Sequence, residues 1–401
     1  MYKLIIIRYG EMGLKGHNFS KFADALADDL NRRLKNKLDF NLDRTFGRFF
    51  LYFEEEKSDI SKEVIETLKT VPGIVSFSPA VKLEPESDIE DLSRTAFKLF
   101  QKKDPQLPST FRVRTNRANK GFPLESPQVS RKVGGYIYEK INQNDNELLS
   151  VDLDNPDTTI ELDIRKSGIY LFIDTYAGTG GLPVGSAESA LLLLSGGIDS
   201  PVAGWEMIRR GVKLNFIHFH TPPYTGERNL EKVRDLARTL AKYNGDANLY
   251  IVNVTNLQKE INKNCHDDYS ITILRRMMLR IASRLGLEIN AQALVTGDCV
   301  GQVASQTLAS LRTIGDVAEL PLLRPLITRD KDDIIKEAKE IGSYETSTLP
   351  FEDCCSLFLP DSPITRPRLK RTEQTESNLD FQPLIEEAIE NIEIERIQGE
   401  N

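Results

Sequence analysis

The stretch Leu191–Arg210, which reads LLLLSGGIDSPVAGWEMIRR, decides the fold of the chain around it. Four consecutive leucines are long enough for a buried strand and too short for a helix. The hexapeptide SGGIDS (Ser195–Ser200) follows, and Pro201 suits the first position of a helix. Gly211 suits the C′ position that ends a helix, and the strand-like run Val212–His220 comes next. The stretch therefore predicts a strand, a glycine loop, a helix and a second strand.

The glycine loop has the features of an anion site. A helix N-terminus presents backbone N–H groups, and Gly196 and Gly197 allow a close approach to them. We expect Asp199 or Ser200 to cap the helix. No Gly-Lys-Ser/Thr follows, which excludes a Walker A loop. A strand followed by SGGxDS is instead similar to the PP-loop of ATP pyrophosphatases, which split ATP between the α and β phosphates and transfer AMP to a substrate oxygen. An ordinary turn with two glycines is the alternative.

Size and composition bound the class of protein. A chain of 401 residues is expected to hold two or three domains. No apolar run is long enough to span a bilayer, and the N-terminus reaches Glu11 after a short apolar core, so we expect neither a membrane segment nor a signal peptide. Four cysteines in a chain of this length are no disulfide framework, which predicts a cytoplasmic protein.

The basic residues are unevenly placed in a chain whose net charge is −8. Between residues 108 and 140, seven basic residues stand against two acidic ones. Apolar residues and arginines alternate along Phe111–Asn116, so one face of this strand is apolar. Without interleaved aromatic residues, the pattern favours contacts to the backbone of folded RNA, and a solvated charged face is the alternative. The candidate RNA-binding residues are Arg112, Arg114, Arg117, Lys120, Arg131 and Lys132.

The first 176 residues predict two small α+β domains. Between Lys3 and Val81 the order strand, helix, two strands, helix, strand is that of a ferredoxin-like domain. Helices are expected at Ile89–Lys103 and Ser126–Ile141, followed by a hairpin. The predicted boundaries are 1–60 for the ferredoxin-like domain, 61–176 for the second domain, 177–189 for a glycine-rich linker and 190–401 for a nucleotide domain with a C-terminal tail.

The nucleotide domain alternates strands and helices, which indicates a doubly wound parallel sheet. Ligands of such sheets lie beyond the carboxyl ends of the strands. The tail is predicted to hold one peripheral helix around Pro383–Ile397. Residues expected at the carboxyl ends are Leu193, Leu194, His218, Phe219 and Gly297.

The histidines and cysteines could bind a metal, hold an iron–sulfur cluster or act as nucleophiles, and their spacing argues against the first two of these roles. His218 and His220 share a strand face, but no third ligand accompanies them, so we predict no metal site built from them. The absence of a Cys-x-x-Cys pair argues against an iron–sulfur cluster or a redox dithiol. Cys354, in a loop-like stretch beside Cys355, is either a structural thiol or a nucleophile.

Taken together, the motifs resemble those of the tRNA 4-thiouridine synthetases (ThiI) over nearly the whole chain. SGGxDS alone indicates only the superfamily, whereas TGDxxGQVxSQT after RRMM is much more specific. The motifs are RYGEMGLKG (8–16), GTGGLPVGS (178–186), LLSGGIDSPVAG (193–204), HFHTPPYT (218–225), RRMMLRIA (275–282), LVTGDCVGQVASQTL (294–308), LLRPLITRDKDDII (322–335) and PFEDCC (350–355).

The resemblance implies a ferredoxin-like domain, a THUMP RNA-binding domain and a PP-loop domain. It implies that uridine 8 of tRNA is adenylated with release of pyrophosphate, and that a persulfide on Cys354 then gives 4-thiouridine and AMP. Asp199 is implied to be catalytic and to orient Mg²⁺, and a cysteine desulfurase is implied as sulfur donor. The residues expected to contact ATP are Leu193, Leu194, Ser195, Gly196, Gly197, Ser200, His218, Phe219, Arg275, Gly297 and Gln306.

The chain resembles a short form of this family, since the longer members continue into a rhodanese domain with a further cysteine. The desulfurase is then expected to load Cys354 directly, and Cys355, Cys299 or an external thiol would resolve the persulfide. The family's role in thiamine thiazole synthesis is tied to the rhodanese domain, so it is the weaker expectation. The sequence leaves the oligomeric state open, with a homodimer among the alternatives.

Two other functions compete with this interpretation. The first is another PP-loop adenylating enzyme, either an amide synthetase of a small metabolite, which needs an ammonia source, or a 2-thiouridylase, which has widely spaced cysteines and no THUMP domain. The second is a non-catalytic THUMP RNA-binding protein. Against the second stand an intact SGGIDS loop, Arg275 and Gln306.

Overall fold

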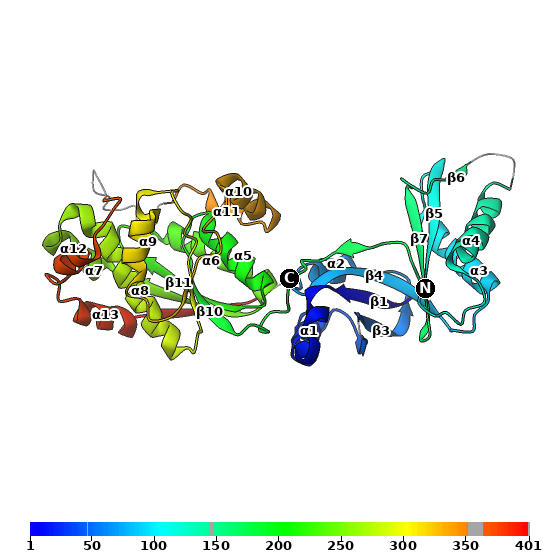
Figure 1. Ribbon diagram of the computed structural model, residues 1–401, viewed down its shortest axis with the longest axis horizontal. Helices are drawn as coiled ribbons and strands as arrows, with labels where there is room; N and C mark the ends of the chain where they lie inside the picture. Colours follow the sequence, from blue (N-terminus) through cyan, green and yellow to red (C-terminus); the bar gives the residue numbers. More distant parts are fainter. Residues whose placement is uncertain (46, 144–147, 352–363, 400–401) are drawn as a thin grey trace. The chain divides into compact units, whose positions relative to one another are not determined.

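The computed structural model of the chain describes residues 1–45, 47–143, 148–351 and 364–399. The chain divides into two compact units, Met1–Gly180 and Gly181–Asn401 (Figure 1). Each unit has its own sheet and its own buried apolar clusters. Among the described residues, no helix combines the length and the apolar composition needed to cross a membrane.

The first part of unit 1 has the predicted ferredoxin-like order. Strand β1 lies at the centre and pairs antiparallel with β3 on one side and β4 on the other. Ser61 accepts a hydrogen bond from the backbone N–H of Val64 and so caps the second helix, as its residue type favours. The elements are β1 (Tyr2–Tyr9), η1 (Glu11–Leu14), η2 (Gly16–Asn18), α1 (Phe19–Leu34), β2 (Phe40–Thr45), β3 (Arg48–Lys57), α2 (Lys62–Lys69) and β4 (Ile74–Leu83).

The second part of unit 1 continues the same sheet. Strand β4 pairs with β1 and also with β8, so the strand order runs β2-β3-β1-β4-β8-β7-β5-β6, with β9 on β4. The predicted boundary between residues 60 and 61 falls inside this unit. The elements are α3 (Ile89–Lys103), β5 (Ser109–Arg117), α4 (Ser126–Ile141), β6 (Leu149–Val151), β7 (Thr158–Arg165), β8 (Gly168–Phe172) and β9 (Tyr176–Ala177).

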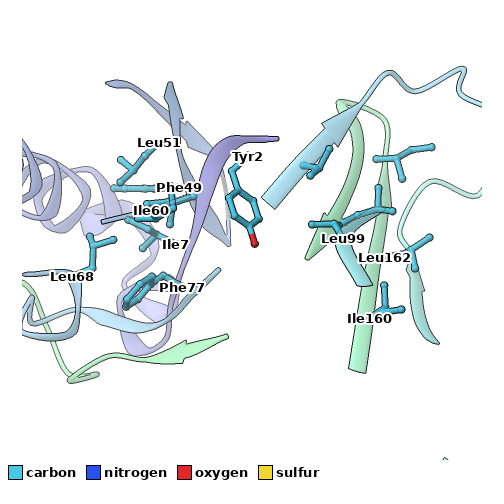
Figure 2. Close-up of a cluster of buried hydrophobic side chains, with 14 of the residues drawn as sticks. Tyr2, Ile7, Phe49, Leu51, Ile60, Leu68, Phe77, Leu99, Ile160 and Leu162 are labelled. Carbon is cyan, nitrogen blue, oxygen red and sulfur yellow. The ribbon is translucent and has the colours of Figure 1, made fainter. Parts of the chain in front are cut away.

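One apolar cluster runs through both parts of unit 1. Alternate residues of a strand point to opposite faces of a sheet, and on β1 it is Ile5 and Ile7 that face this cluster. Their partners on β3 are Leu51 and Phe49, which are also buried. Figure 2 shows Ile7, Phe49 and Leu51 in the first part and Leu99, Ile160 and Leu162 in the second.

Unit 2 is a doubly wound sheet, as predicted. Its strand order is β14-β13-β10-β11-β12-β15, parallel except for β15. On β10, Leu192 packs into one apolar cluster and Leu191 into another, because helices cover both faces (Figure 1). The strands are β10 (Ser189–Leu193), β11 (Lys213–His220), β12 (Ala247–Asn253), β13 (Leu294–Val295), β14 (Leu322–Leu323) and β15 (Glu393–Ile397).

The helices of unit 2 follow the strands in alternation until the tail. They are α5 (Asp199–Arg209), α6 (Glu227–Asn244), α7 (Thr255–Asn264), η3 (Asp267–Tyr269), α8 (Ser270–Glu288), η4 (Ala304–Gln306), α9 (Leu308–Gly315), α10 (Lys331–Glu340), α11 (Tyr344–Ser347), α12 (Leu369–Glu376) and α13 (Phe381–Glu390).

The tail corrects one prediction. The expected helix around Pro383–Ile397 ends at Glu390, and the remainder forms β15, antiparallel to β12. Two contacts explain the strand: Ile397 is buried, and the Arg234 guanidinium donates to both carboxylate oxygens of Glu395 at 2.9 and 2.7 Å. The end of the tail is thus the edge strand of the sheet, hydrogen-bonded to β12, and not part of a peripheral helix.

The start of α5 corrects a second prediction. The helix begins at Asp199, so Pro201 occupies its third position, and Ile198 is the N-cap residue without a side-chain cap. Neither Asp199 nor Ser200 caps the helix. The predicted end is confirmed, because Gly211 has φ of +83° and a Cβ there would lie 2.4 Å from Ser186 Oγ.

Candidate functional site

A cavity of about 520 Å³ opens at the carboxyl ends of β10, β11 and β13. This is where a doubly wound sheet places its ligands. Gly196 is the one predicted ATP contact that does not line it, although both of its neighbours in the loop region do. The predicted residues that line the cavity are Leu193, Leu194, Ser195, Gly197, Asp199, Ser200, His218, Phe219, Arg275, Gly297 and Gln306.

The glycine loop is tied together by its two terminal serines. The backbone N–H of Ser195 donates to Ser200 Oγ at 2.9 Å, and that of Gly197 donates to Ser195 Oγ at 3.3 Å. Two of the expected loop donors therefore have partners inside the loop. Gly297 packs directly on the start of α5, since a Cβ there would lie 2.7 Å from the Ser200 nitrogen. The loop is held at fixed distance from the exit of β13.

The carboxylate of Asp199 is held by two donors that the sequence did not single out. Lys331 Nζ lies 2.5 Å from its Oδ1, and Gln302 Nε2 donates to its Oδ2 at 2.8 Å. Lys331 begins α10 and Gln302 lies between β13 and α9. Both residues are inside motifs quoted for the family resemblance, which is the signal that could have found them.

A buried carboxylate, that of Asp298, forms ion pairs in the wall of the cavity. Asp298, only 4% exposed, accepts from Arg275 Nη2 at 2.6 Å, from Thr296 Oγ1 at 2.8 Å and from Arg324 Nε at 3.4 Å. Burial raises the pKa of this carboxyl, but the charge and hydrogen bond of Arg275, with Thr296 and Arg324, outweigh it and hold the pKa below its ordinary value. Asp298 is therefore ionised at neutral pH.

Part of the cavity lining is apolar. Ile217, Phe219 and Met278 belong to this part. The buried ring of His218 places Nδ1 2.9 Å from the carbonyl oxygen of Leu194, so this nitrogen carries the proton. In the part of the chain that the structure describes, the side-chain oxygen Oε1 of Gln306 is buried and has no hydrogen-bond partner. Gln306 thus offers an acceptor to a ligand with an N–H or O–H donor.

Cys354 lies outside the described residues, and so does Cys355. The described residues before this segment contact the glycine loop region, since Ser347 Oγ donates to the Gly197 carbonyl at 3.4 Å. After it, Ile364 lines the cavity. The other two cysteines are buried, and burial raises the pKa of the Cys265 thiol to about 11.

The candidate RNA-binding residues lie in unit 1 and fall into two sets. Thr115 on β5 contacts Ser130 of α4, so Arg112 and Arg114, at alternate positions, occupy the opposite sheet face. Arg114 forms a two-pronged ion pair with Glu161 at 2.9 and 2.6 Å. The other set, on the α4 side, comprises Arg117, Lys120, Arg131 and Lys132, the last two exposed on the helix. The structure does not gather all six on one surface.

Comparisons with known proteins follow the same division of the chain. The family described as "ThiI ferredoxin-like domain" matches residues 4–78, "THUMP domain" matches residues 86–174, and "Thiamine biosynthesis protein (ThiI)" matches residues 185–381. A solved structure described as a 4-thiouridine synthetase–RNA complex with bound ATP is similar, with 36% identity, a TM-score of 0.88 and coverage of 99% of this chain and 100% of that one.

Curated relatives agree over the full length. A "Probable tRNA sulfurtransferase" of Halothermothrix orenii is 46% identical over 400 residues, covering 99% of this chain and 100% of the relative. Another of the same name, from Brevibacillus brevis, is 45% identical and covers 99% of this chain and 96% of the relative. With identity of this level from end to end, and a PP-loop cavity and a THUMP domain in one molecule, the chain belongs to the ThiI family of tRNA sulfurtransferases.

Proposed function

We propose that this chain is an ATP-dependent tRNA sulfurtransferase that converts uridine 8 of tRNA to 4-thiouridine. The observation that carries the proposal is the cavity, which collects Asp199, Arg275 and the glycine loop at one edge of the unit 2 sheet. A buried acceptor on Gln306 and the apolar part of the lining suit an adenine nucleoside. The relative solved with RNA and ATP, 36% identical over 99% of this chain, supports the same pair of substrates.

The first step adenylates the base. Oxygen O4 of the uridine attacks the α-phosphorus of ATP, the bond between the α and β phosphates breaks, and pyrophosphate leaves. Arg275 and the N–H groups at the start of α5 stabilise the negative charge that develops on the phosphates. AMP on O4 is then a good leaving group, whereas the original carbonyl oxygen is not.

The Asp199 carboxylate, whose two oxygens accept from Lys331 and Gln302, is the group that would hold Mg²⁺. It lines the cavity at the loop and supplies the hard oxygen ligand that Mg²⁺ prefers. Bound Mg²⁺ would neutralise phosphate charge at that position. The chain's own part is to aim this carboxylate, and Lys331 and Gln302 do so.

The second step transfers sulfur. The terminal sulfur of a persulfide on Cys354 bonds to C4, and AMP leaves with the former O4. A thiol then attacks the remaining disulfide, which releases 4-thiouridine and leaves a new disulfide. Cys299 is a poor candidate for that thiol, because it is buried and its Sγ lies against the Arg329 carbonyl at 3.2 Å. Cys355 or an external thiol serves instead, and a cysteine desulfurase loads Cys354 in the cytoplasm.

The tRNA is held by unit 1 and brought to the loop of unit 2, so positioning supplies part of the catalysis. The α4 set of basic residues suits this role better than Arg114, whose charge is balanced by Glu161.

A reconstitution tests the function. The full chain is incubated with ATP, Mg²⁺, unmodified tRNA, cysteine and a cysteine desulfurase, and the absorbance band of 4-thiouridine is followed. We expect the band with the wild-type chain and none with Asp199→Ala or Cys354→Ser. Full activity of Cys354→Ser would show that sulfur travels by another route, and thiolation at another base would refute the assignment to uridine 8.

A further inference from the structure

We propose that Asp298 and Arg324 are positioning residues that hold the Arg275 guanidinium toward the phosphates of bound ATP. The inference rests on the proposed function, because it assigns the machinery behind one ATP contact. Arg275 lines the cavity from α8, and Asp298, at the exit of β13, lines it beside Arg275. Neither Asp298 nor Arg324 belongs to the residues predicted from the sequence to touch ATP.

The geometry of Asp298 leaves it little freedom. One carboxylate oxygen accepts from Arg275, and the other accepts from Thr296 and Arg324. The side chain is 5% exposed. A buried carboxylate with both oxygens occupied cannot rotate without losing hydrogen bonds, and each such loss is costly. Asp298 therefore fixes one edge of the Arg275 guanidinium, at Nη2.

Arg324 fixes Asp298 in turn. It follows β14, and its Nη2 donates to the Leu311 carbonyl of α9 at 3.3 Å. Gly315 provides the space for this guanidinium, because a Cβ there would lie 3.1 Å from Nη2. Three elements, α8, the β13 exit and the β14 exit, thus meet at one carboxylate.

The charges explain why both arginines are needed. Two guanidinium groups and one carboxylate leave a net charge of +1 beside a cavity meant for a polyphosphate. Without Asp298 the two cations would repel each other across a buried space, and Arg275 would lose its aim. Another contact, from Arg275 Nη1 to the Ser305 carbonyl, is longer at 3.4 Å and therefore weaker than the pairing with Asp298.

The test is a double-mutant cycle in the full chain. Asp298→Asn, Arg275→Met and the double variant are compared by the KM for ATP in pyrophosphate release with saturating tRNA. Alone, Asp298→Asn should raise this KM roughly 10- to 100-fold, as expected for an outer partner of a ligand-binding group. In the Arg275→Met background it should change KM by less than about 2-fold, since contacting residues couple. Arg324→Met should act in the same direction, and its effect should also vanish without Arg275.

Glu376→Gln provides the matched control. Glu376 is another buried carboxylate that pairs with two arginines of α8, Arg276 and Arg280, but it does not line the cavity. The Glu376→Gln variant should lower the urea midpoint of unfolding as much as Asp298→Asn does, and it should leave the KM for ATP unchanged. An equal rise of KM in this control, or an Asp298→Asn effect that persists without Arg275, overturns the inference. If the wild-type chain releases no pyrophosphate, the proposed function fails, and the same cycle measured as the Kd for ATP still decides the positioning role.

Discussion

The Asp199 carboxylate at the glycine loop is oriented by Lys331, which lies 132 positions later in the chain. Lys331 Nζ holds Asp199 and adds a positive charge beside the glycine loop. We expect Lys331→Met to slow pyrophosphate release by a factor on the order of 100, the scale for loss of one electrostatic contact to a transition state. Stability in urea should change little, because the pair is partly exposed.

Lys336→Met is the control for this prediction, because Lys336 is an exposed lysine on the same helix, α10. It should release pyrophosphate at the wild-type rate. Equal rates for the two variants would mean that Asp199 keeps its orientation without Lys331.

Sequence patterns could predict those site residues that sit at strand ends or in the loop. Leu193, His218 and Gly297 follow apolar runs, and the sheet brings their ends together. Asp298 and Lys331 could not be assigned roles in this way, because their partners are distant in sequence and their residue types are common on surfaces. The SGGIDS sequence also predicts a helix capped by Asp199 or Ser200. In the structure the Ser200 hydroxyl instead accepts from the Ser195 N–H and donates to the Ser195 carbonyl.

At the level of elements, the edge strand β15 should contribute to the stability of unit 2. The carboxylate of Glu395 accepts two hydrogen bonds from the Arg234 guanidinium of α6. This pairing raises the pKa of that guanidinium above its ordinary value. We expect Glu395→Ala to lower the free energy of unfolding by about 1 kcal/mol, the upper range for a partly exposed ion pair of good geometry. Glu393→Ala removes the same charge from an exposed position of the strand and should cost less. Urea unfolding measures both, and equal losses would contradict a specific role of the pair.

Strand β15 also shows which element bounds cannot be predicted from the sequence. Helices α3 and α4 have the bounds predicted from sequence, since Asp88 caps the first and Glu125 with Gln128 forms a capping box on the second. The tail has a stop signal in Asn391, the C-cap residue of α13, but the apolar residues that follow it continue the helical pattern in the sequence. Only the open edge of β12 turns Glu393–Ile397 into a strand, and that edge is a property of the folded sheet.

For the whole molecule, the two units should unfold as two transitions. Among the residues that the structure describes, each apolar cluster is built from residues of one unit. ATP at about 100 times its Kd should stabilise unit 2 alone by about 2.7 kcal/mol. For a unit of this size that shift raises the midpoint by roughly 5–10 °C in calorimetry.

A variant assigns the transitions independently of ATP. Ser61→Ala removes the cap of α2 in unit 1, where the Ser61 hydroxyl accepts from the Val64 N–H at 3.3 Å, and should cost about 1 kcal/mol. The Ser61→Ala variant should lower the midpoint temperature of the transition whose midpoint ATP does not change. A single transition that responds to both ATP and Ser61→Ala would show instead that the units unfold together, so that nucleotide binding in one unit stabilises the fold of the other.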